Sequence, residues 1–474
     1  MDERGGKIVL AVLLAAALGV AVYLARSMPG MFGNTAYIGA LIFLQLLIVA
    51  VWNYRRWFFL FLMIGFLWAG LDVPMNGAWV SGRWVLLAVG AIAGFVVFMS
   101  QRHHRYGAFH LLAGTAVLAA FVSAMVSDLP SLSLSKAVSL LLLFLYAGSG
   151  GRTAILGRER DFASGLLVAS EVAVYATAIA YFALGQEPWG NTNSLGLAMG
   201  IVSGILLWGI LISQSRAARG RRSFAFTLGI TLLIFSNSRA SILSSAVTMG
   251  ILCISLRKNR LLFRGIAITV CLASVFAIFA PSKLANFMSE SSETLIYKGH
   301  REGGVLGSRQ SPWQQTMRSV RQHPWFGTGF GTSAVEQGPS EVGTYFSNQA
   351  TLREHGSSYF EILEWAGYVG VLPFLGLVLV LCWHIARVAR WLHRQGNLGH
   401  PIVPMMLVLL TGLLHAGFED WLFAVGYYAA VFFWTLAFSF IDLSAALADS
   451  TVRVPNWTHA PVAAPNFGMA TPGR

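Results

Sequence analysis

The sequence contains few charged residues. Only 11% of its 474 residues are Asp, Glu, Lys or Arg, whereas 56% are hydrophobic. Soluble globular proteins carry about 25% charged residues, so this chain lacks the polar surface that a water-soluble particle of its size needs. The scarcity of charge excludes a cytosolic enzyme and a disordered chain, and it indicates a polytopic membrane protein.

Cysteine is also scarce. The chain has 3 cysteines, at Cys253, Cys271 and Cys382, and each lies within an apolar run. Their spacing fits neither a metal site nor a disulfide framework. The sequence also has no Gly-Lys-Ser/Thr segment after a predicted strand, which excludes a phosphate-binding loop. We therefore predict no metal and no cofactor.

Long apolar runs are abundant instead. A transmembrane helix needs about 20 mainly apolar residues to cross about 30 Å of hydrocarbon. We count fourteen runs that approach this length, at residues 8–25, 37–52, 57–73, 84–100, 108–127, 134–149, 166–184, 195–213, 224–238, 240–256, 261–281, 366–385, 401–418 and 422–443. These runs predict an all-α polytopic membrane protein with about 14 (12–14) transmembrane helices.

Basic residues gather on alternate linkers between these runs. With the N-terminus in the cytoplasm, twenty Lys and Arg residues fall on the cytoplasmic side and four on the opposite short loops. The positive-inside rule then places both termini in the cytoplasm. The net charge of +13 is interpreted mainly as an orientation signal, with contact to anionic membrane lipids as the alternative, and not as a nucleic-acid-binding surface.

This topology divides the chain into four parts. Residues 1–281 hold eleven spans, and residues 282–365 form one large helical loop outside the cytoplasm. Residues 366–443 hold the last three spans, and the Pro/Ala-rich tail 444–474 is expected to be disordered in the cytoplasm. Glu171, a carboxylate within a span, is expected to have an internal partner.

An arginine is predicted below the outer membrane surface. Residues 236–241 form a turn between two runs whose far ends are both basic, so the runs are two crossings. The first crossing, Phe224 to Ser236, has only 13 residues, or about 20 Å of helix. A charge at that depth costs a few kcal/mol, so Arg239 is expected to face a cavity or a partner. The alternative is an arginine that extends to the headgroups.

Two helix starts are predicted in the large outer loop. Ser311 and Pro312 suit the N-cap and the first position of one helix. Ser358 and Glu361 have the spacing of a capping box, and the helix that they begin is predicted to end at Gly367. Exposed N–H groups and the helix dipole make such starts favourable for an anion.

A polar residue accompanies each of these starts. Arg309 lies two residues before the first N-cap, and His355 lies three residues before the second. The arrangement indicates an anion-binding site formed by the loop. A lone histidine in a loop is ordinarily just solvated, and this is the alternative for His355.

Three motifs follow one another along the chain. They are Ser238-Arg239; Arg309-x-x-x-Trp313 with Pro324-x-Phe326-Gly327-x-Gly329-Phe330-Gly331; and His355-x-Ser-x-Tyr-Phe-Glu-x-Leu-x-x-x-Gly367-x-x-Gly370. Together they resemble the O-antigen ligase and O-antigen polymerase superfamily of bacterial envelope glycosyltransferases, over roughly residues 190–420. Many members have Asn directly after the histidine, whereas this chain has Gly356.

The resemblance implies a glycosyltransferase of the type C kind in the bacterial cytoplasmic (inner) membrane, with its active site facing the periplasm. Such an enzyme moves a glycan from undecaprenyl diphosphate to an acceptor hydroxyl without metal or nucleotide. The functional residues of the family fall on Arg239, Arg309 and His355. A direct displacement would invert the anomeric centre.

The residue chemistry agrees with this resemblance. Guanidinium groups give permanently charged, bidentate contacts to a diphosphate. A neutral histidine, with an ordinary pKa of about 6.5, suits a general base for a sugar hydroxyl, although a histidine that only orients the acceptor is the alternative. Trp313, Glu419 and Asp420 complete the predicted substrate-binding set, with ordinary interfacial placement as the alternative for the two acids.

The acceptor is left open. A repeat-unit polymerase for O-antigen or exopolysaccharide, whose acceptor is a lipid-linked glycan, is slightly favoured. An O-antigen ligase acting on lipid A-core and a protein O-oligosaccharyltransferase share the donor chemistry. A lipid-linked oligosaccharide flippase is the alternative from another class. Partners of a polymerase would include a flippase and a chain-length regulator.

Overall fold

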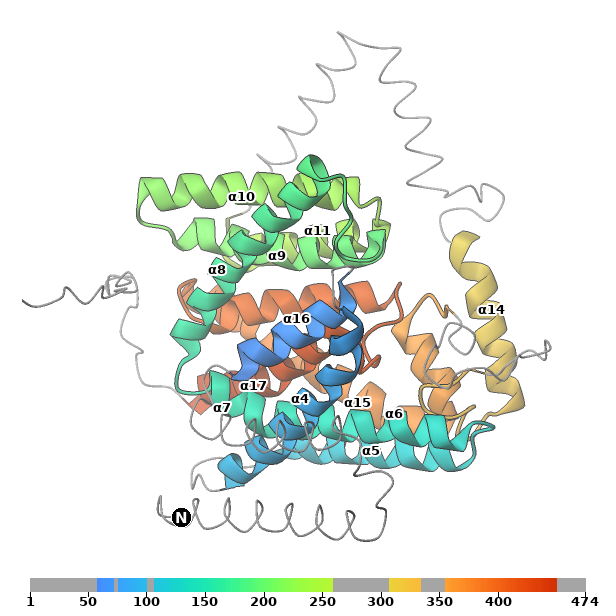
Figure 1. Ribbon diagram of the computed structural model, residues 1–474. Coiled ribbons are helices and arrows are strands. Elements are labelled where there is room, and N and C mark those ends of the chain that lie inside the picture. The colour runs from blue at the N-terminus through green and yellow to red at the C-terminus, as the bar shows by residue number, and fades with distance from the viewer. Residues whose placement is uncertain (1–57, 72–75, 100–105, 259–306, 334–353, 450–474) are drawn as a thin grey trace, which may run out of the picture.

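The protein is built from helices that pack side by side (Figure 1). The computed structural model describes residues 58–71, 76–99, 106–258, 307–333 and 354–449. These residues include no strand, and seven of their helices are long and apolar enough to cross a membrane. The prediction of an all-α polytopic membrane protein is thereby confirmed.

The count of fourteen spans stays a prediction. The runs at 8–25, 37–52 and 261–281 lie outside the described residues, as do parts of the loop 282–365 and most of the tail 444–474. Each of the other eleven predicted spans overlaps a helix. Three of those helices are apolar but shorter than a full crossing.

Most of the described residues are helical. After a helix at Phe58–Gly70 come α4 (Asn76–Met99), α5 (Ala108–Met125), α6 (Pro130–Tyr146), α7 (Arg152–Ile155), α8 (Glu159–Ala178), α9 (Thr192–Ile212), α10 (Arg216–Phe235), α11 (Arg239–Ser255), α14 (Gly307–Gln322), α15 (Ser358–Gln395), α16 (Ile402–Ala416) and α17 (Tyr428–Asp449). Two π-helical turns, η1 (Ala147–Gly151) and η2 (Ile179–Ala183), extend α6 and α8. Helix α14 stands across one end of the bundle that the others form (Figure 1).

Helices α9 and α17 lie at the centre of the bundle. In their apolar windows 72% and 67% of the residues are buried, against 39% in α8 and α15. Trp434 of α17 is fully buried, and its ring packs edge-on against Phe144 of α6 at 5.1 Å. Helix α15 instead exposes Leu372 and Leu379, which are seven residues apart and share one face that suits contact with lipid.

The two ends of the bundle carry different side chains. At one end, Trp208 Nε1 of α9 donates to Leu398 O at 2.8 Å, and His393 Nδ1 of α15 lies 3.4 Å from Ile254 O of α11. Exposed arginines gather at this end, namely Arg216, Arg219, Arg221, Arg390 and Arg394. The opposite end holds α14, the turn between α5 and α6, and the first residues of α11 and α15 (Figure 1). We call these the basic end and the α14 end.

The buried carboxylate of Glu171 has partners from α10. Its Oε2 lies 2.6 Å from Arg221 Nε, and its Oε1 lies 3.4 Å from Arg222 Nε. Arg222 Nη1 also donates to Ser213 Oγ at 2.6 Å. The internal partner expected for this intramembrane carboxylate is therefore a pair of arginines at the basic end.

Helix α14 begins earlier than the sequence predicts. Its first residue is Gly307, so Pro312 lies inside the helix and not at its first position. Pro312 has no N–H, so it cannot donate to the carbonyl of Ser308 one turn earlier. Arg309 consequently lies in the first turn of α14 and not before it. The predicted end near Gln322 is confirmed.

Helix α15 has its N-cap one residue before the predicted one, and its helical geometry is interrupted at Gly367, where the sequence predicts a helix end. The N-cap is Ser357, whose hydroxyl accepts from Tyr359 N–H at 3.3 Å. At Gly367 the backbone adopts φ 67° and ψ −174°, which kinks the helix, and the helix then continues to Gln395. A glycine tolerates this positive φ, so the chain can change direction without leaving the bundle.

Candidate functional site

The glycine motif of the outer loop joins the kink of α15. Because Gly367 breaks the helix, the carbonyls of Glu364 and Trp365 lose their helical partners. Thr328 N–H donates to Glu364 O at 3.0 Å. Gly329 N–H donates to Trp365 O at 3.2 Å. The loop thereby satisfies the carbonyls that the kink exposes.

The amides beyond the kink are satisfied by the same loop. Tyr368 N–H donates to Pro324 O at 2.7 Å, and Val369 N–H donates to Trp325 O at 3.1 Å. A Cβ on Gly367 would lie 2.6 Å from the carbonyl carbon of Trp325, so the two backbones touch. The motif is therefore a structural joint, which agrees with the exclusion of a phosphate-binding loop.

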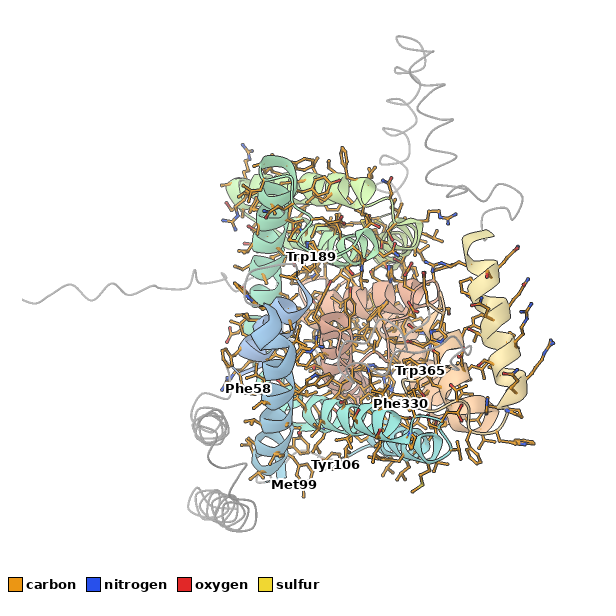
Figure 2. The ribbon with its side chains drawn as sticks, turned by 45° about the vertical axis from the view of Figure 1, so that its right-hand side comes forward. Phe58, Met99, Tyr106, Trp189, Phe330 and Trp365 are labelled. Carbon is orange, nitrogen blue, oxygen red and sulfur yellow. The ribbon has the colours of Figure 1, made fainter. Side chains whose placement is uncertain are left out.

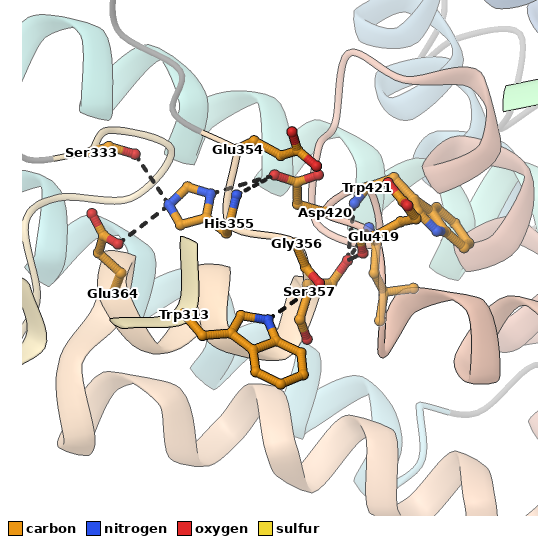
Figure 3. Close-up of polar contacts among 12 residues, drawn as sticks. Trp313, Ser333, Glu354, His355, Gly356, Ser357, Glu364, Glu419, Asp420 and Trp421 are labelled. Atoms are coloured by element: carbon orange, nitrogen blue, oxygen red, sulfur yellow. Dashed lines mark hydrogen bonds and ion pairs between the residues drawn. The ribbon is translucent and has the colours of Figure 1, made fainter. Parts of the chain in front are cut away.

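His355 lies buried beside this joint, with 1% of its surface exposed. On one side its Nε2 lies 3.2 Å from Ser333 Oγ and 3.4 Å from Glu364 Oε2. On the other side its Nδ1 lies 3.6 Å from Asp420 Oδ2, and its backbone N–H donates to the same oxygen at 2.8 Å. Figure 3 shows the ring between these groups. Each ring nitrogen thus faces a carboxylate.

Aromatic rings cover the histidine. The ring of Trp365 meets His355 edge-on at 6.0 Å and Phe330 at 5.4 Å. Figure 2 shows Phe330 and Trp365 together near the start of α15. An apolar cover keeps water away and strengthens the electrostatic interactions of the charged groups beneath it.

Three carboxylates lie around the histidine, those of Glu361, Glu364 and Asp420. Glu361 and Glu364 of α15 are 4% and 0% exposed. Ligand atoms of His355, Glu361 and Asp420 all lie within 4.8 Å of one another, so this cluster could hold a metal ion. The sequence analysis missed Glu361 because it assigned this residue to a capping box. With Ser357 as the actual N-cap, Glu361 belongs to the cluster instead.

The acids set the charge of His355. Burial alone would lower its pKa, but its contacts with Asp420 and Glu364 and the charge of Glu361 outweigh burial and raise the pKa to about 9. Burial would raise the pKa of Asp420, but the nearby ring of His355 and the hydrogen bond from its backbone N–H outweigh burial and lower that pKa. At neutral pH the pair is therefore an imidazolium and a carboxylate, not the neutral histidine that the sequence analysis expects.

Arg309 projects from α14 onto two carboxylates. Its Nη1 lies 2.5 Å from Glu354 Oε1, and its Nη2 pairs with Glu419 Oε1. Glu354 is 65% exposed, whereas Arg309 and Glu419 are 12% and 11% exposed. Arg309 is thus held at the edge of the histidine cluster by one exposed partner, Glu354, and one buried partner, Glu419.

Gly356, directly after the histidine, has a backbone conformation and a close neighbour that favour glycine. Its φ is +66°, and a Cβ there would lie 2.9 Å from Arg309 Cδ. A side chain at this position would push against the arginine. The glycine therefore allows α14 to pack closely onto the start of α15.

Trp313 contributes to the same contact. Its ring stacks on Phe360 with 5.2 Å between centroids and an angle of 19°, and its Nε1 donates to Gly356 O at 3.4 Å. Phe360 therefore covers one face of the indole. The observed contacts attach α14 to α15, while the predicted contact of Trp313 with substrate stays a proposal.

Ser358 fixes the acidic loop between α16 and α17. Its N–H donates to Glu419 O at 3.0 Å, and its hydroxyl donates to the same oxygen at 2.7 Å. Trp421 N–H and Leu422 N–H donate to this hydroxyl at 2.9 and 3.0 Å. Glu419 and Asp420 are thereby positioned on the start of α15, a role for Ser358 that only the tertiary structure shows.

Arg239 reaches the site from a separate helix. It is the first residue of α11, after a turn in which Asn237 has φ 51°. Its side chain is half-buried, and it lies close enough to Arg309 for the two guanidinium groups to repel each other. The structure thus places Arg309 beside the histidine cluster and Arg239 near enough to Arg309 to feel its charge.

The comparisons with known proteins bear on this assembly. No curated protein sequence matches the chain. The family model described as O-antigen ligase matches residues 224–375, which contain Arg239, Arg309, His355 and the glycine motif. The match covers about a third of the chain and shows a similarity to that family over this segment. Residues 224–375 are thus the part of the chain that is similar to the O-antigen ligase family, the resemblance that its motifs predict.

Proposed function

We propose that the protein transfers a glycan from undecaprenyl diphosphate to an acceptor hydroxyl at the periplasmic face of the bacterial inner membrane. The observation that carries the proposal is the convergence of Arg239 and Arg309, from different helices, beside the buried cluster around His355. The cluster lies at the α14 end, opposite the basic end of the bundle. By the positive-inside rule, the basic end faces the cytoplasm.

The arginines suit the diphosphate of the donor. Two permanently charged guanidinium groups supply bidentate contacts and stabilise the negative charge that develops on the leaving diphosphate. Glu354 is well exposed and shares Arg309, so it is the partner that a diphosphate would replace. The buried pair with Glu419 would keep Arg309 oriented during this exchange.

The transfer needs no nucleotide, and we propose that it needs no metal. The arginines provide the positive charge that a divalent cation supplies in other diphosphate chemistry. The reaction would be a direct displacement that inverts the anomeric centre. A chelator tests this point, because His355, Glu361 and Asp420 are close enough to share a cation.

For the acceptor we favour a second lipid-linked glycan, which makes the protein a repeat-unit polymerase that works with a flippase and a chain-length regulator. Transfer to lipid A-core or to a protein hydroxyl would use the same donor site. A flippase would be expected to have its polar site near the membrane midplane between similar halves. In the described residues, the arginine and histidine assembly instead lies at one end of the bundle.

The experiment is glycan transfer by the purified protein in detergent, with undecaprenyl-diphosphate glycan as donor and EDTA present. Wild type is compared with Arg239→Ala, Arg309→Ala and His355→Ala, and with Arg390→Ala at the exposed basic end as the matched control. We expect transfer by wild type and the control, and its loss in the three site variants. Full transfer by the site variants would refute the assigned site. Movement of lipid-linked glycan across liposomes without transfer would replace the proposal by a flippase.

A further inference from the structure

We infer that Asp420 is the catalytic group that accepts the proton of the acceptor hydroxyl, and that His355 is a positioning residue for Asp420. The inference rests on the proposed function and names the base of that reaction. It differs from the sequence expectation, in which His355 itself takes the proton.

The four members of the cluster differ in how exposed their side chains are, and therefore in whether a substrate can reach them. The side chains of His355 and Glu364 are 1% and 0% exposed, and Glu361 is 4% exposed. Asp420 is 21% exposed. A sugar hydroxyl must come within about 3 Å of its base, and only Asp420 among these four groups presents surface to such an approach.

The contacts of the histidine ring point to the same assignment. A general base needs a ring nitrogen that can accept a proton from substrate, but each ring nitrogen of His355 already faces a carboxylate. Its Nε2 lies against Glu364 and Ser333, and its Nδ1 lies against Asp420. For His355 to take a proton from substrate, one buried ion pair would have to separate, which is strongly unfavourable.

Asp420 is held in one orientation. Its Oδ2 receives the backbone N–H of His355 at 2.8 Å and faces the ring at 3.6 Å. The loop that carries it is tied to α15 by the hydroxyl of Ser358, which accepts from the next residue, Trp421. A carboxylate fixed by its partners on one side is preorganised to receive a hydroxyl on the other.

The neighbouring acids are less suitable as bases. Glu419 pairs with Arg309, and so does Glu354. Both carboxylates are thus engaged by the guanidinium that would bind the donor, and they lie where the diphosphate would bind. Asp420 is next to Glu419 in sequence, so it lies beside the leaving-group site without occupying it.

The step balances as follows. The acceptor hydroxyl oxygen forms a bond to the anomeric carbon of the donor sugar as the bond from that carbon to the diphosphate oxygen breaks. The bonding electrons leave with the diphosphate, whose added charge Arg239 and Arg309 stabilise. The hydroxyl proton passes to the carboxylate of Asp420, and water outside the site removes it after the product leaves.

The test measures kcat and the donor KM for wild type, Asp420→Asn, His355→Gln and the double variant. The matched control is Asp161→Asn, an exposed aspartate in the first turn of α8. We expect Asp420→Asn to lower kcat by about 10² to 10⁴ with the donor KM nearly unchanged. His355→Gln should lower kcat by about tenfold, and the double variant should match Asp420→Asn, because the histidine acts through the aspartate.

Chemical rescue keeps the test independent of folding. Asp420→Ala leaves space for a small carboxylate, so added formate should restore kcat at least about tenfold in this variant and not in His355→Ala. A kcat for Asp420→Asn close to wild type, or a loss in Asp420→Ala that formate does not restore, would overturn the inference. Absence of transfer by wild type would instead refute the proposed function.

Discussion

The basic end and the α14 end of the bundle both bury charged groups, but they balance them differently. At the basic end Glu171 meets two arginines, and deeper in the bundle Arg152 lies 2.5 Å from Asp442. At the α14 end a single histidine meets three carboxylates. Where a carboxylate meets arginines, the contact joins helices; where one histidine meets three acids, of which Asp420 is partly exposed, the site can accept a proton or a cation.

The pair of Arg152 and Asp442 shows what a structural ion pair requires. The side chain of Arg152 is 2% exposed, its Nη1 donates to Gly148 O at 3.2 Å, and its guanidinium lies 4.6 Å from the centre of the Phe98 ring. These contacts join α4, the α6–α7 segment and α17. Every contact of this arginine that we describe holds helices together, whereas Arg309 holds its partners beside an open edge.

Removing Arg152 should therefore have the largest effect on stability. Arg152→Ala leaves Asp442 in a buried setting without its partner, which costs about 3–5 kcal/mol. We expect a clearly lower midpoint of thermal unfolding in detergent, and loss of activity only in proportion to loss of folded protein. An unchanged midpoint would show that the charge balance at this pair does not stabilise the fold.

Arg309 should show the opposite pattern. Arg309→Ala should lower kcat/KM by about 10² to 10³, the range for removal of one charge-stabilising donor. Arg309→Lys should restore only part of the loss, because lysine cannot make the bidentate contact. Because Arg309→Ala also leaves Glu419 without its partner, the midpoint of thermal unfolding should fall, but by less than in Arg152→Ala. A large drop in that midpoint would place Arg309 with the structural arginines.

The joint at Gly367 should be sensitive to a single methyl group. Gly367→Ala places a Cβ 2.6 Å from the backbone of Trp325 at a positive φ. We expect a loss of about 1–3 kcal/mol in the free energy of unfolding, measured by thermal unfolding. Gly165→Ala is the control, since a Cβ there meets no atom within 4 Å. Equal midpoints for the two variants would contradict a rigid joint.

The pH dependence of stability and of kcat tests the charge of His355 at the α14 end. Because the folded-state pKa of His355 is raised to about 9, its contribution to stability is present below about 6.5 and is lost as pH rises through about 9. If its imidazolium positions Asp420, kcat should stay level from neutral pH and fall by about tenfold in total as the pH rises through 9. His355→Gln should remove this alkaline fall. A kcat that rises with pH up to 9 would make His355 the base.

The smallest effect is expected at Glu354. Glu354→Gln removes the exposed carboxylate that competes with a diphosphate for Arg309. Exposed pairs contribute about 0.2–1 kcal/mol, so the donor KM should fall by about two- to fivefold while kcat changes little. A higher donor KM would mean that Glu354 orients Arg309 for the donor instead of competing with it.

Sequence reasoning identified the parts of the site that local patterns encode. The short run before Arg239, bounded by arginines at its far end, predicted the turn at which α11 begins. The partners of Glu171 were not predictable, because Arg221 and Arg222 are about fifty residues away and only helix packing brings them near. Glu361 was misassigned because a capping box and a buried site acid share the same local spacing.

The charge of His355 also could not be predicted from the sequence. A histidine in a loop starts from an ordinary pKa, and its shift depends on Asp420, which is 65 residues away. The helix break at Gly367 was recognised as an end because glycine commonly stops helices. The chain continues as a second helical segment after this break, because the loop at 324–329 supplies the missing backbone partners. Local sequence does not predict that pairing.

The backbone joint between the glycine motif and the kink has an evolutionary consequence. The contacts at this joint are made by main-chain atoms. Selection therefore acts on the lack of a side chain at the glycines and not on side-chain chemistry. A Cβ on Gly367 would meet the backbone of Gly327, and a Cβ on Gly327 would meet the backbone of Glu364 and Trp365, so the two glycines should change together or not at all among related chains. A motif of this kind would persist across enzymes with different sugars and acceptors, because it fixes the contact between two segments and does not contact the substrate.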